Sequence, residues 1–484
     1  MWAETLAGTP VDVQSVVDRR WSSHYGAHEM DETQRSISGP STAGADVVEG
    51  TTRKDRVIAK IVSFLARAVY RDIEVHGEPV PRGSRLTVSN HFGGFSDALV
   101  LLHVLPTRPG IVARDVIWRV PVVGRLMNWV GAIPVHKPED GGAQSNNDQM
   151  FASCYKALED EGHILIFPEG VTRNEPSIAR VKTGAARIAL GARAHGAGDI
   201  EIVPVGIHYE DKAALRSRVF VKGGEPLDLD ELVPRDEGAL DRGADDRDSV
   251  AVVTEAIDVG LRRAAPDFAD WDEARLLGTA AEVTLRSQFA DPTSAVPIGL
   301  RDRLANALAD RPAAQRRRIC EAAVEYRHDL DALGLTDGEL HDRLGSGRFT
   351  LSAIWQVLVG VLLAPFALLG AVINIIPFLV VKAVGLLRVA PSMLATIKPV
   401  AAFVAFGITW GVLIWRATAS TGWVAGAAVL VLLPVYLAAV VWFVERMTLL
   451  WNLVRRWRRR SRTESFAEHL VSHREALVEA VLAA

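Results

Sequence analysis

The sequence has few cysteines and no excess of charge of either sign. Two cysteines among 484 residues argue against a disulfide framework and against a cysteine-rich structural zinc site. The 54 basic and 58 acidic residues give a formal charge of −4, which offers no overall electrostatic basis for binding nucleic acid. We therefore expect a protein of a reducing compartment that has no nucleic-acid partner.

Several familiar catalytic motifs are also missing. The chain has no phosphate loop ending in Gly-Lys-Ser/Thr, no Gly-x-Ser-x-Gly elbow and no spacing that we assign to a metal site, so we predict no metal or cofactor. The N-terminus lacks a basic stretch followed by an apolar one, the pattern of a cleaved secretion signal. We therefore expect any membrane insertion to depend on internal segments.

The composition changes along the chain in a way that indicates two or three domains. We predict a polar, disordered lead-in over residues 1–52, an α/β domain over 53–226, a helical connector over 227–350, an apolar helical region over 351–448 and a basic tail over 449–484. Within 53–226, short β-rich runs alternate with helical stretches, a pattern typical of a mostly parallel sheet flanked by helices.

The first helix of the α/β domain has basic and apolar residues at helical spacing. Val57, Ile61 and Leu65 recur along it, interrupted by Lys54 and Lys60. Such a helix can pack on the domain as an ordinary surface helix, or it can dock on an anionic membrane face. The sequence leaves both interpretations open.

The apolar region over 351–448 predicts membrane-spanning helices. Residues 351–373 are about long enough to cross a bilayer, a shorter leg follows Asn374, and further candidates lie at about 400–415 and 422–444. Four crossings, or a re-entrant hairpin and two crossings, place the α/β domain and the arginine cluster near residue 458 on the same, cytoplasmic side. The alternative is an apolar core of a soluble protein, in which such long uncharged runs are unusual.

Two segments combine strand ends with groups that can carry chemistry. In the first, SNHFGGFSD, His91 can accept a proton from a hydroxyl, and Asp97 can fix the imidazole tautomer if the glycines fold it back. In the second, Glu169 and Gly170 follow an apolar run and precede Arg173 and Lys182, and this set suits a substrate with hydroxyl and phosphate groups. A capped turn and a solvated surface turn are the respective alternatives.

The order and spacing of four blocks resemble those of a known family. The blocks are His91 with Asp97, the strand GAIPVHK that ends at Lys137, Phe-Pro-Glu-Gly at 167–170, and Val-Pro-Val at 203–205. Over about residues 55 to 226 they resemble the PlsC-like glycerolipid acyltransferases. The segments KTGAARIAL and IVPVGIHYEDK look especially like the glycerol-3-phosphate acyltransferase branch.

This resemblance implies a fold, an activity and a site. It implies an α/β acyltransferase domain in which His91 is the general base and Asp97 its orienting partner. It implies that acyl-CoA or acyl-carrier protein is the acyl donor and that a glycerol phosphate or lysophospholipid is the acceptor, beside membrane lipid. The residues expected to bind substrate are Lys137, Glu169, Gly170, Arg173 and Lys182. Two positions depart from the commonest pattern: five residues, rather than four, separate His91 from Asp97, and Lys137 stands where arginine is more usual.

The leading hypothesis is acyl transfer to lysophosphatidic acid in phospholipid biosynthesis, by an integral membrane protein with a cytoplasmic catalytic domain. Acylation of the sn-1 hydroxyl of glycerol 3-phosphate is the first alternative, since the motifs do not separate the two acceptors. A non-catalytic lipid-binding membrane protein is the second. A transport role is disfavoured because Lys382 is almost the only ionisable residue inside the apolar segments.

Overall fold

The computed structural model divides the chain into two compact units, which are described separately. The first unit contains residues 1–275 and 297–309, and the second contains residues 276–296 and 310–484. Within them the structure describes residues 52–77, 84–119, 121–136, 146–212, 214–235, 243–287, 296–333, 336–338, 346–389 and 391–483.

The first unit is built on a mixed, mostly parallel sheet with the strand order β1-β7-β6-β2-β5-β3-β4, and β8 pairs with β6 beside this path. All pairings are parallel except those of β6 with β7 and with β8. The strands are β1 Asp72–His76, β2 Ser84–Ser89, β3 Gly110–Arg114, β4 Ile133–Val135, β5 His163–Ile166, β6 Ile200–Tyr209, β7 Arg218–Gly223 and β8 Leu227–Asp228.

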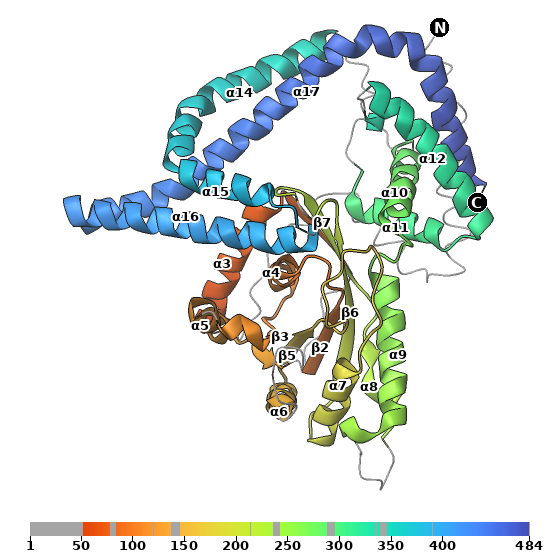
Figure 1. Ribbon diagram of the computed structural model, residues 1–484, viewed down its shortest axis with the longest axis vertical. Coiled ribbons are helices and arrows are strands. Elements are labelled where there is room, and N and C mark those ends of the chain that lie inside the picture. The colour runs from red at the N-terminus through yellow and green to blue at the C-terminus, as the bar shows by residue number, and fades with distance from the viewer. Residues whose placement is uncertain are drawn as a thin grey trace. The chain divides into compact units, whose positions relative to one another are not determined.

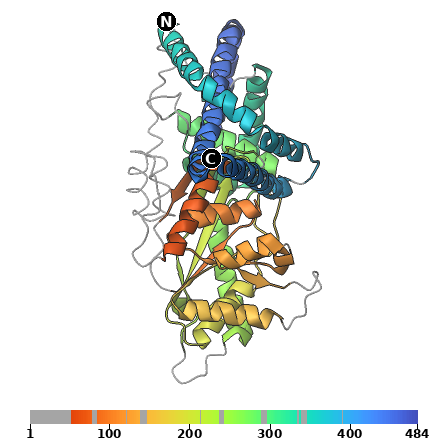
Figure 2. The same cartoon turned by 90° about the vertical axis from the view of Figure 1, so that its left-hand side faces the viewer.

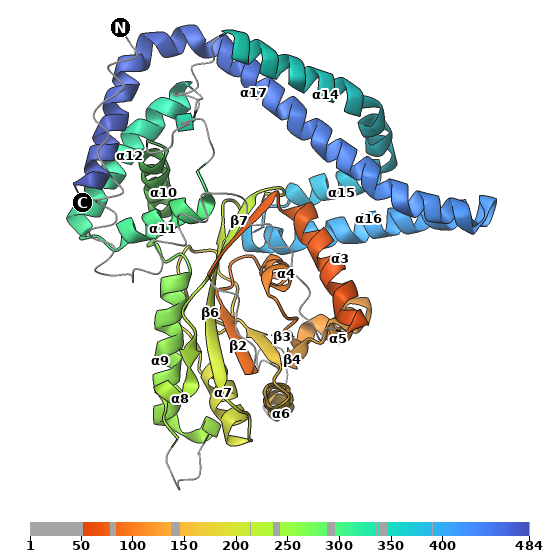
Figure 3. The ribbon, with the colours of Figure 1, turned by 180° about the vertical axis from the view of Figure 1, so that it is seen from behind.

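Helices cover both faces of this sheet. Helices α6, α7 and α9 share one apolar core with β2, β5 and β6, in which Leu86, Ile164 and Ile257 are completely buried. Helices α3, α4 and α5 lie on the other side (Figures 1 and 3), and in Figure 2 the ribbons of α3 and α4 stand in front of the strands. The helices of this unit are α3 Arg53–Val69, α4 Phe95–Val104, α5 Pro121–Val130, α6 Asn146–Glu159, α7 Gly184–Ala194, α8 Leu229–Leu232, α9 Arg247–Ala264 and α11 Ile298–Ala309, with 3₁₀ turns η1 Asp115–Arg119 and η3 Gly243–Asp245.

The predicted α/β class with a mostly parallel, helix-flanked sheet is confirmed. Because the sheet is covered by helices on both faces, every residue of β2 is buried, including its polar side chains. The residues predicted as a connector, 227–350, are shared between the two units: 227–275 and 297–309 belong to the first unit and the rest to the second. Helix α9 packs into the core of the first unit through Val253 and Ile257.

Strand pairing places the ends of β6, β2 and β5 at one edge. Ser89 at the end of β2 pairs with Val205 of β6, and Val88 pairs with Ile166 at the end of β5. Because the three strands run parallel, the residues that follow them emerge at the same edge, where open α/β sheets bind their ligands.

Helix α3 buries one apolar stripe and exposes another. Thr52 caps it in a capping box with Asp55. Ile58 and Val62 are buried, whereas Val57, Ile61 and Phe64 are 45%, 44% and 50% exposed. Helices that dock on a membrane face expose an apolar stripe of this kind.

The second unit consists of helices. They are the larger part of α10 Trp271–Arg286, then α12 Ala313–Leu333, α14 Ser346–Ile373, α15 Ile375–Gly385, α16 Pro391–Thr421 and α17 Trp423–Leu482. Within the described residues, three helical segments are long and apolar enough to cross a membrane: 354–373, 396–421 and 423–451. Helix α14 lies beside α17, and α15 beside α16 (Figures 1 and 3).

Asn374 forms the joint between α14 and α15 and is completely buried. Its amide nitrogen donates to the carbonyl of Gly370 at 2.8 Å, and its oxygen accepts from the Trp410 indole of α16 at 2.8 Å. These hydrogen bonds satisfy a polar side chain among apolar helices. They also hold α15, the short leg predicted from the sequence, against α16.

A buried histidine at the start of β5 makes the first unit sensitive to acid. His163 is 8% exposed, and its two ring nitrogens lie 2.8 Å from the Thr87 hydroxyl and 2.9 Å from the Thr107 hydroxyl. Burial, together with the nearby charge of Arg85, lowers the pKa of His163 from 6.5 to about 4.

The unfolded chain therefore binds a proton more readily than the folded one between pH 6.5 and 4. The contribution of neutral His163 to stability is present above pH 6.5 and is lost as the pH falls toward 4, by on the order of 3 kcal/mol in the free energy of unfolding. We expect His163→Gln to flatten this part of the pH profile, measured as the midpoint of thermal unfolding at pH 7, 5.5 and 4.5. The exposed His195, replaced by glutamine, is the control; equal pH profiles for the wild type and His163→Gln would contradict the prediction.

Candidate active site

A tight turn after β2 brings His91 and Asp97 together. His91 Nδ1 lies 2.9 Å from Asp97 Oδ2, and the two side chains are 20% and 0% exposed. The turn depends on two glycines. Gly94 has a φ of +62°, and a β-carbon on Gly93 would come within 2.8 Å of Asp97 Oδ1. The longer spacing between His91 and Asp97 is thus compatible with direct contact.

Asp97 is held by donors besides His91. The backbone N–H of Gly93 donates to both carboxylate oxygens, at 3.0 and 2.8 Å, and the Tyr209 hydroxyl donates to Oδ1 at 2.6 Å. Burial, and then the charge of Asp97, raises the pKa of Tyr209 well above its usual value. Tyr209 therefore stays protonated and acts as a donor.

Sequence reasoning did not single out Tyr209. It lies in the segment IVPVGIHYEDK, which contributed only to the family resemblance. Its position at the end of a strand could have pointed to it. Tyr209 is the last residue of β6, which runs parallel to the strand that precedes His91, and polar groups at such strand ends are candidate site residues.

The imidazole of His91 is fixed on a second side by an aromatic ring. Its ring stacks on Phe167 with 4.2 Å between centroids and 22° between planes. Phe167 follows β5, the other neighbour of β2. The stacking and the bond to Asp97 together restrict the ring to one orientation.

Glu169 lies at the same edge but is engaged with the backbone. It is 1% exposed, its Oε1 accepts the N–H of His91 at 2.9 Å, and its Oε2 accepts the N–H of Ala179 at 2.8 Å. Burial raises the pKa of Glu169, although these two hydrogen bonds oppose the rise. The carboxylate thus ties the segment after β5 to the backbone of His91.

The other predicted residues of the second segment also come close. The N–H of Arg173 donates to the carbonyl of His91 at 3.0 Å, and its guanidinium pairs with Glu175 at 3.0 Å. Gly170 has a φ of +63°, and a β-carbon there would lie 3.0 Å from Lys182 Nζ. Lys182 is exposed, so its ammonium group is accessible beside the dyad segment.

One further cation lies near Arg173, and one predicted cation falls outside the described residues. Lys212 Nζ donates to the carbonyl of Arg173 at 3.4 Å and lies 5.1 Å from the ring centre of Trp271. Sequence reasoning gave Lys212 no role. Strand β4 ends at Val135, and Lys137 lies outside the residues that the structure describes.

The comparisons with known proteins agree on the class of this site. Residues 72–208, which include His91, Asp97 and Glu169, match a family model described as "Acyltransferase". This segment is similar to acyltransferase domains. The predicted resemblance to the glycerolipid acyltransferases is confirmed over these residues.

Two curated relatives are yeast proteins. Glycerol-3-phosphate O-acyltransferase 2 of Saccharomyces cerevisiae is 37% identical over 86 residues, which cover 18% of this chain and 12% of that protein. Glycerol-3-phosphate O-acyltransferase 1 of the same yeast is 27% identical over 150 residues, which cover 31% of this chain and 19% of that protein. The matched segments span less than a fifth of the length of these relatives.

Among solved structures, the chain is similar to the 1-acyl-sn-glycerophosphate acyltransferase PlsC from Thermotoga maritima. The similarity has a TM-score of 0.31 and 17% identity, and it covers 43% of this chain and 79% of that chain.

The geometry of the site predicts a structural role for Glu169 that a substitution can reveal. In Glu169→Gln the side-chain amide replaces one of the two acceptor oxygens, so either the His91 or the Ala179 N–H faces a second donor in a buried place. We expect a loss of about 1 to 3 kcal/mol in the free energy of unfolding, seen by denaturant titration. A variant as stable as the wild type, with only KM raised, would instead favour the acceptor contact expected from the sequence.

Proposed function

We propose that the protein is an O-acyltransferase that moves a fatty-acyl group from acyl-CoA or acyl-carrier protein to a hydroxyl of a glycerol phosphate acceptor. The observation that carries this proposal is the imidazole of His91, oriented by the buried Asp97 at the ligand-binding edge of an acyltransferase domain.

The dyad geometry supports direct transfer. With Nδ1 bound to Asp97, Nε2 of His91 is the nitrogen that accepts the hydroxyl proton as the acceptor oxygen attacks the thioester carbonyl. The ester C–O bond forms, the C–S bond breaks, and the imidazolium returns its proton to the departing thiolate. Asp97 stabilises the imidazolium between these steps.

The cations beside the dyad suit the phosphate of the acceptor. Arg173 lies next to His91 in space, and the ammonium group of Lys182 is exposed beside Gly170. A guanidinium and an ammonium bind phosphate oxygens by charge-assisted hydrogen bonds. In this proposal they place the acceptor hydroxyl near Nε2.

Glycerol 3-phosphate is the acceptor that we place first, ahead of the lysophosphatidic acid expected from the sequence. Both curated relatives are named glycerol-3-phosphate O-acyltransferases, and the segments 182–190 and 202–212 resemble the same branch. Lysophosphatidic acid is the second candidate, since it carries the same glycerol phosphate group.

The second unit supports a membrane location. Its three long apolar segments suit a protein whose acyl donor and product are amphiphilic. With α14 and α15 as a re-entrant pair and two crossings by α16 and α17, Arg388, Lys398 and the arginine cluster at 455–462 fall on one side of the membrane. The positive-inside rule makes that side cytoplasmic, and the exposed stripe of α3 would dock the catalytic domain there.

Purified full-length protein in detergent, incubated with labelled acyl-CoA and either acceptor, tests this function. Lysophosphatidic acid formed from glycerol 3-phosphate supports the first acceptor, and phosphatidic acid formed only from lysophosphatidic acid supports the second. If neither product forms with acyl-CoA or with acyl-carrier protein as donor, the proposal is wrong and the non-catalytic alternative gains support.

A further inference from the structure

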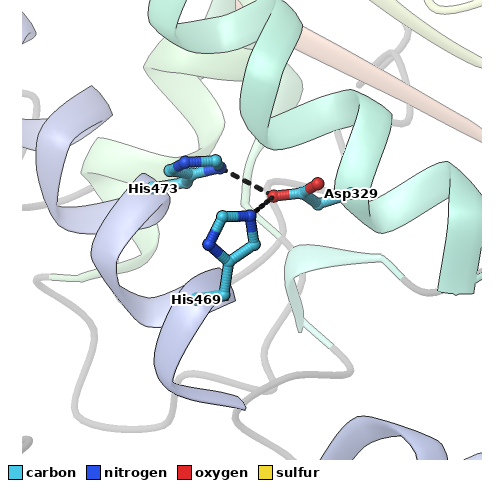
Figure 4. A group of neighbouring side chains, drawn as sticks. All are labelled: Asp329, His469 and His473. Carbon is cyan, nitrogen blue, oxygen red and sulfur yellow. Dashed lines mark hydrogen bonds and ion pairs between the residues drawn. The ribbon is translucent and has the colours of Figure 1, made fainter. Parts of the chain in front are cut away.

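Three potential metal ligands meet in the second unit, on helices far apart in the sequence. Asp329 lies on α12, and His469 and His473 lie one helical turn apart on α17 (Figure 4). Asp329 Oδ2 lies 2.7 Å from His473 Nδ1 and 3.7 Å from His469 Nε2. The ligand atoms of all three residues lie within 4.8 Å of one another.

These separations fit a small divalent ion that prefers nitrogen and oxygen ligands. Tetrahedral zinc with ligand bonds of about 2.0 to 2.1 Å requires neighbouring ligand atoms roughly 3.3 Å apart. The two separations from Asp329, 2.7 and 3.7 Å, lie on either side of that value. Histidines at positions i and i+4 share one helix face, as in helical zinc sites. We propose that Asp329, His469 and His473 bind Zn²⁺.

The helices that present these ligands are held together independently of an ion. Arg474, the neighbour of His473, donates to Asp337 at 2.9 Å, and Tyr326 of α12 donates to the same carboxylate at 2.6 Å. Asp337 is 6% exposed, and Leu470 and Leu477 of α17 are buried. The ligands therefore sit on packed elements, which reduces the cost of assembling the site.

The site is open to solvent on one side, so an ion can reach it. The His469 side chain is 57% exposed, whereas those of His473 and Asp329 are 27% and 20% exposed. Water can therefore complete the coordination on the exposed side. With ligands from two helices, the bound ion would fasten the end of α17 to α12 and stabilise the second unit.

Zinc content and affinity test the site directly. We would use the full chain in detergent without a polyhistidine tag, strip it with a chelator, add Zn²⁺, and measure bound zinc per chain and its affinity against a chromophoric chelator. One equivalent is expected, and His469→Gln and Asp329→Asn should each weaken binding by at least about tenfold. His328→Gln is the matched control, because His328 is exposed on α12 directly beside Asp329 and should leave binding unchanged.

A second readout separates loss of the site from loss of the fold. Co²⁺ in place of Zn²⁺ should give a visible absorption band that disappears in His469→Gln, whose helical circular dichroism stays at the wild-type level. Substoichiometric zinc in the wild type, or equal affinity in the wild type and His469→Gln, would overturn the proposal and leave a metal-free His–Asp cluster. The readouts do not involve acyl transfer, so the proposal stands or falls independently of the proposed function.

Discussion

His91→Ala should lower the rate of acyl transfer by roughly 10²- to 10⁴-fold, the usual contribution of a positioned general base. The substitution removes the only group of the dyad that can take the acceptor proton, while the buried Asp97 keeps its hydrogen bonds to Gly93 and Tyr209. We expect the loss in kcat and little change in KM, measured with labelled acyl-CoA and glycerol 3-phosphate.

The matched control for this variant is His195→Ala, which removes an exposed histidine at the end of α7, away from the dyad. Circular dichroism and the thermal midpoint of His91→Ala should remain close to those of the wild type, because His91 is only partly buried. Turnover at the wild-type rate by a folded His91→Ala protein would rule out His91 as the base.

Asp97→Asn should cause a loss of similar size for a different reason. Asp97 accepts hydrogen bonds from Gly93, Tyr209 and the Nδ1 of His91, and an asparagine offers only one oxygen to these donors. If its amide nitrogen turns to His91, Nδ1 becomes the acceptor and the proton moves to Nε2, where it blocks uptake of the acceptor proton. We expect kcat to fall by roughly 10²- to 10⁴-fold.

A KM that stays near the wild-type value would support this mechanism, since Asp97 is completely buried and cannot meet the substrate directly. Tyr209→Phe is the graded comparison: it removes one donor but keeps the carboxylate, and we expect a loss of about tenfold or less. If Asp97→Asn retained wild-type kcat, the dyad mechanism would be wrong.

Much of the α/β domain could be predicted because its strands and helices carry local patterns. The runs that became β3, β5 and β6 are mostly apolar and rich in branched side chains, and β2 has Leu86 and Val88 between polar residues before the turn at Asn90. The sequence did not indicate that β7 pairs antiparallel with β6, or that α9 joins the same core. Both depend on contacts between segments that are distant in the sequence. The periodic spacing of apolar residues within one segment carries no information about such contacts.

Glu169 shows the same limit at the site. A carboxylate after a strand suggested a contact with the acceptor, and its position at the edge of the sheet agrees with that interpretation. In the structure both of its oxygens accept backbone N–H groups, one of them from His91. Which partner a buried carboxylate has is set by the packing of β2 against β5.

By itself the sequence determined the elements that depend on neighbouring residues. The family signature and the contact of His91 with Asp97 are of this kind, because the dyad spans six positions and a glycine turn closes it. Only the tertiary structure showed the contact of Tyr209 with Asp97, which are 112 positions apart in the sequence. The same holds for His473 and Asp329, which are 144 positions apart. These contacts arise from strand order and helix packing, which place residues together through the burial of apolar surface elsewhere in the chain.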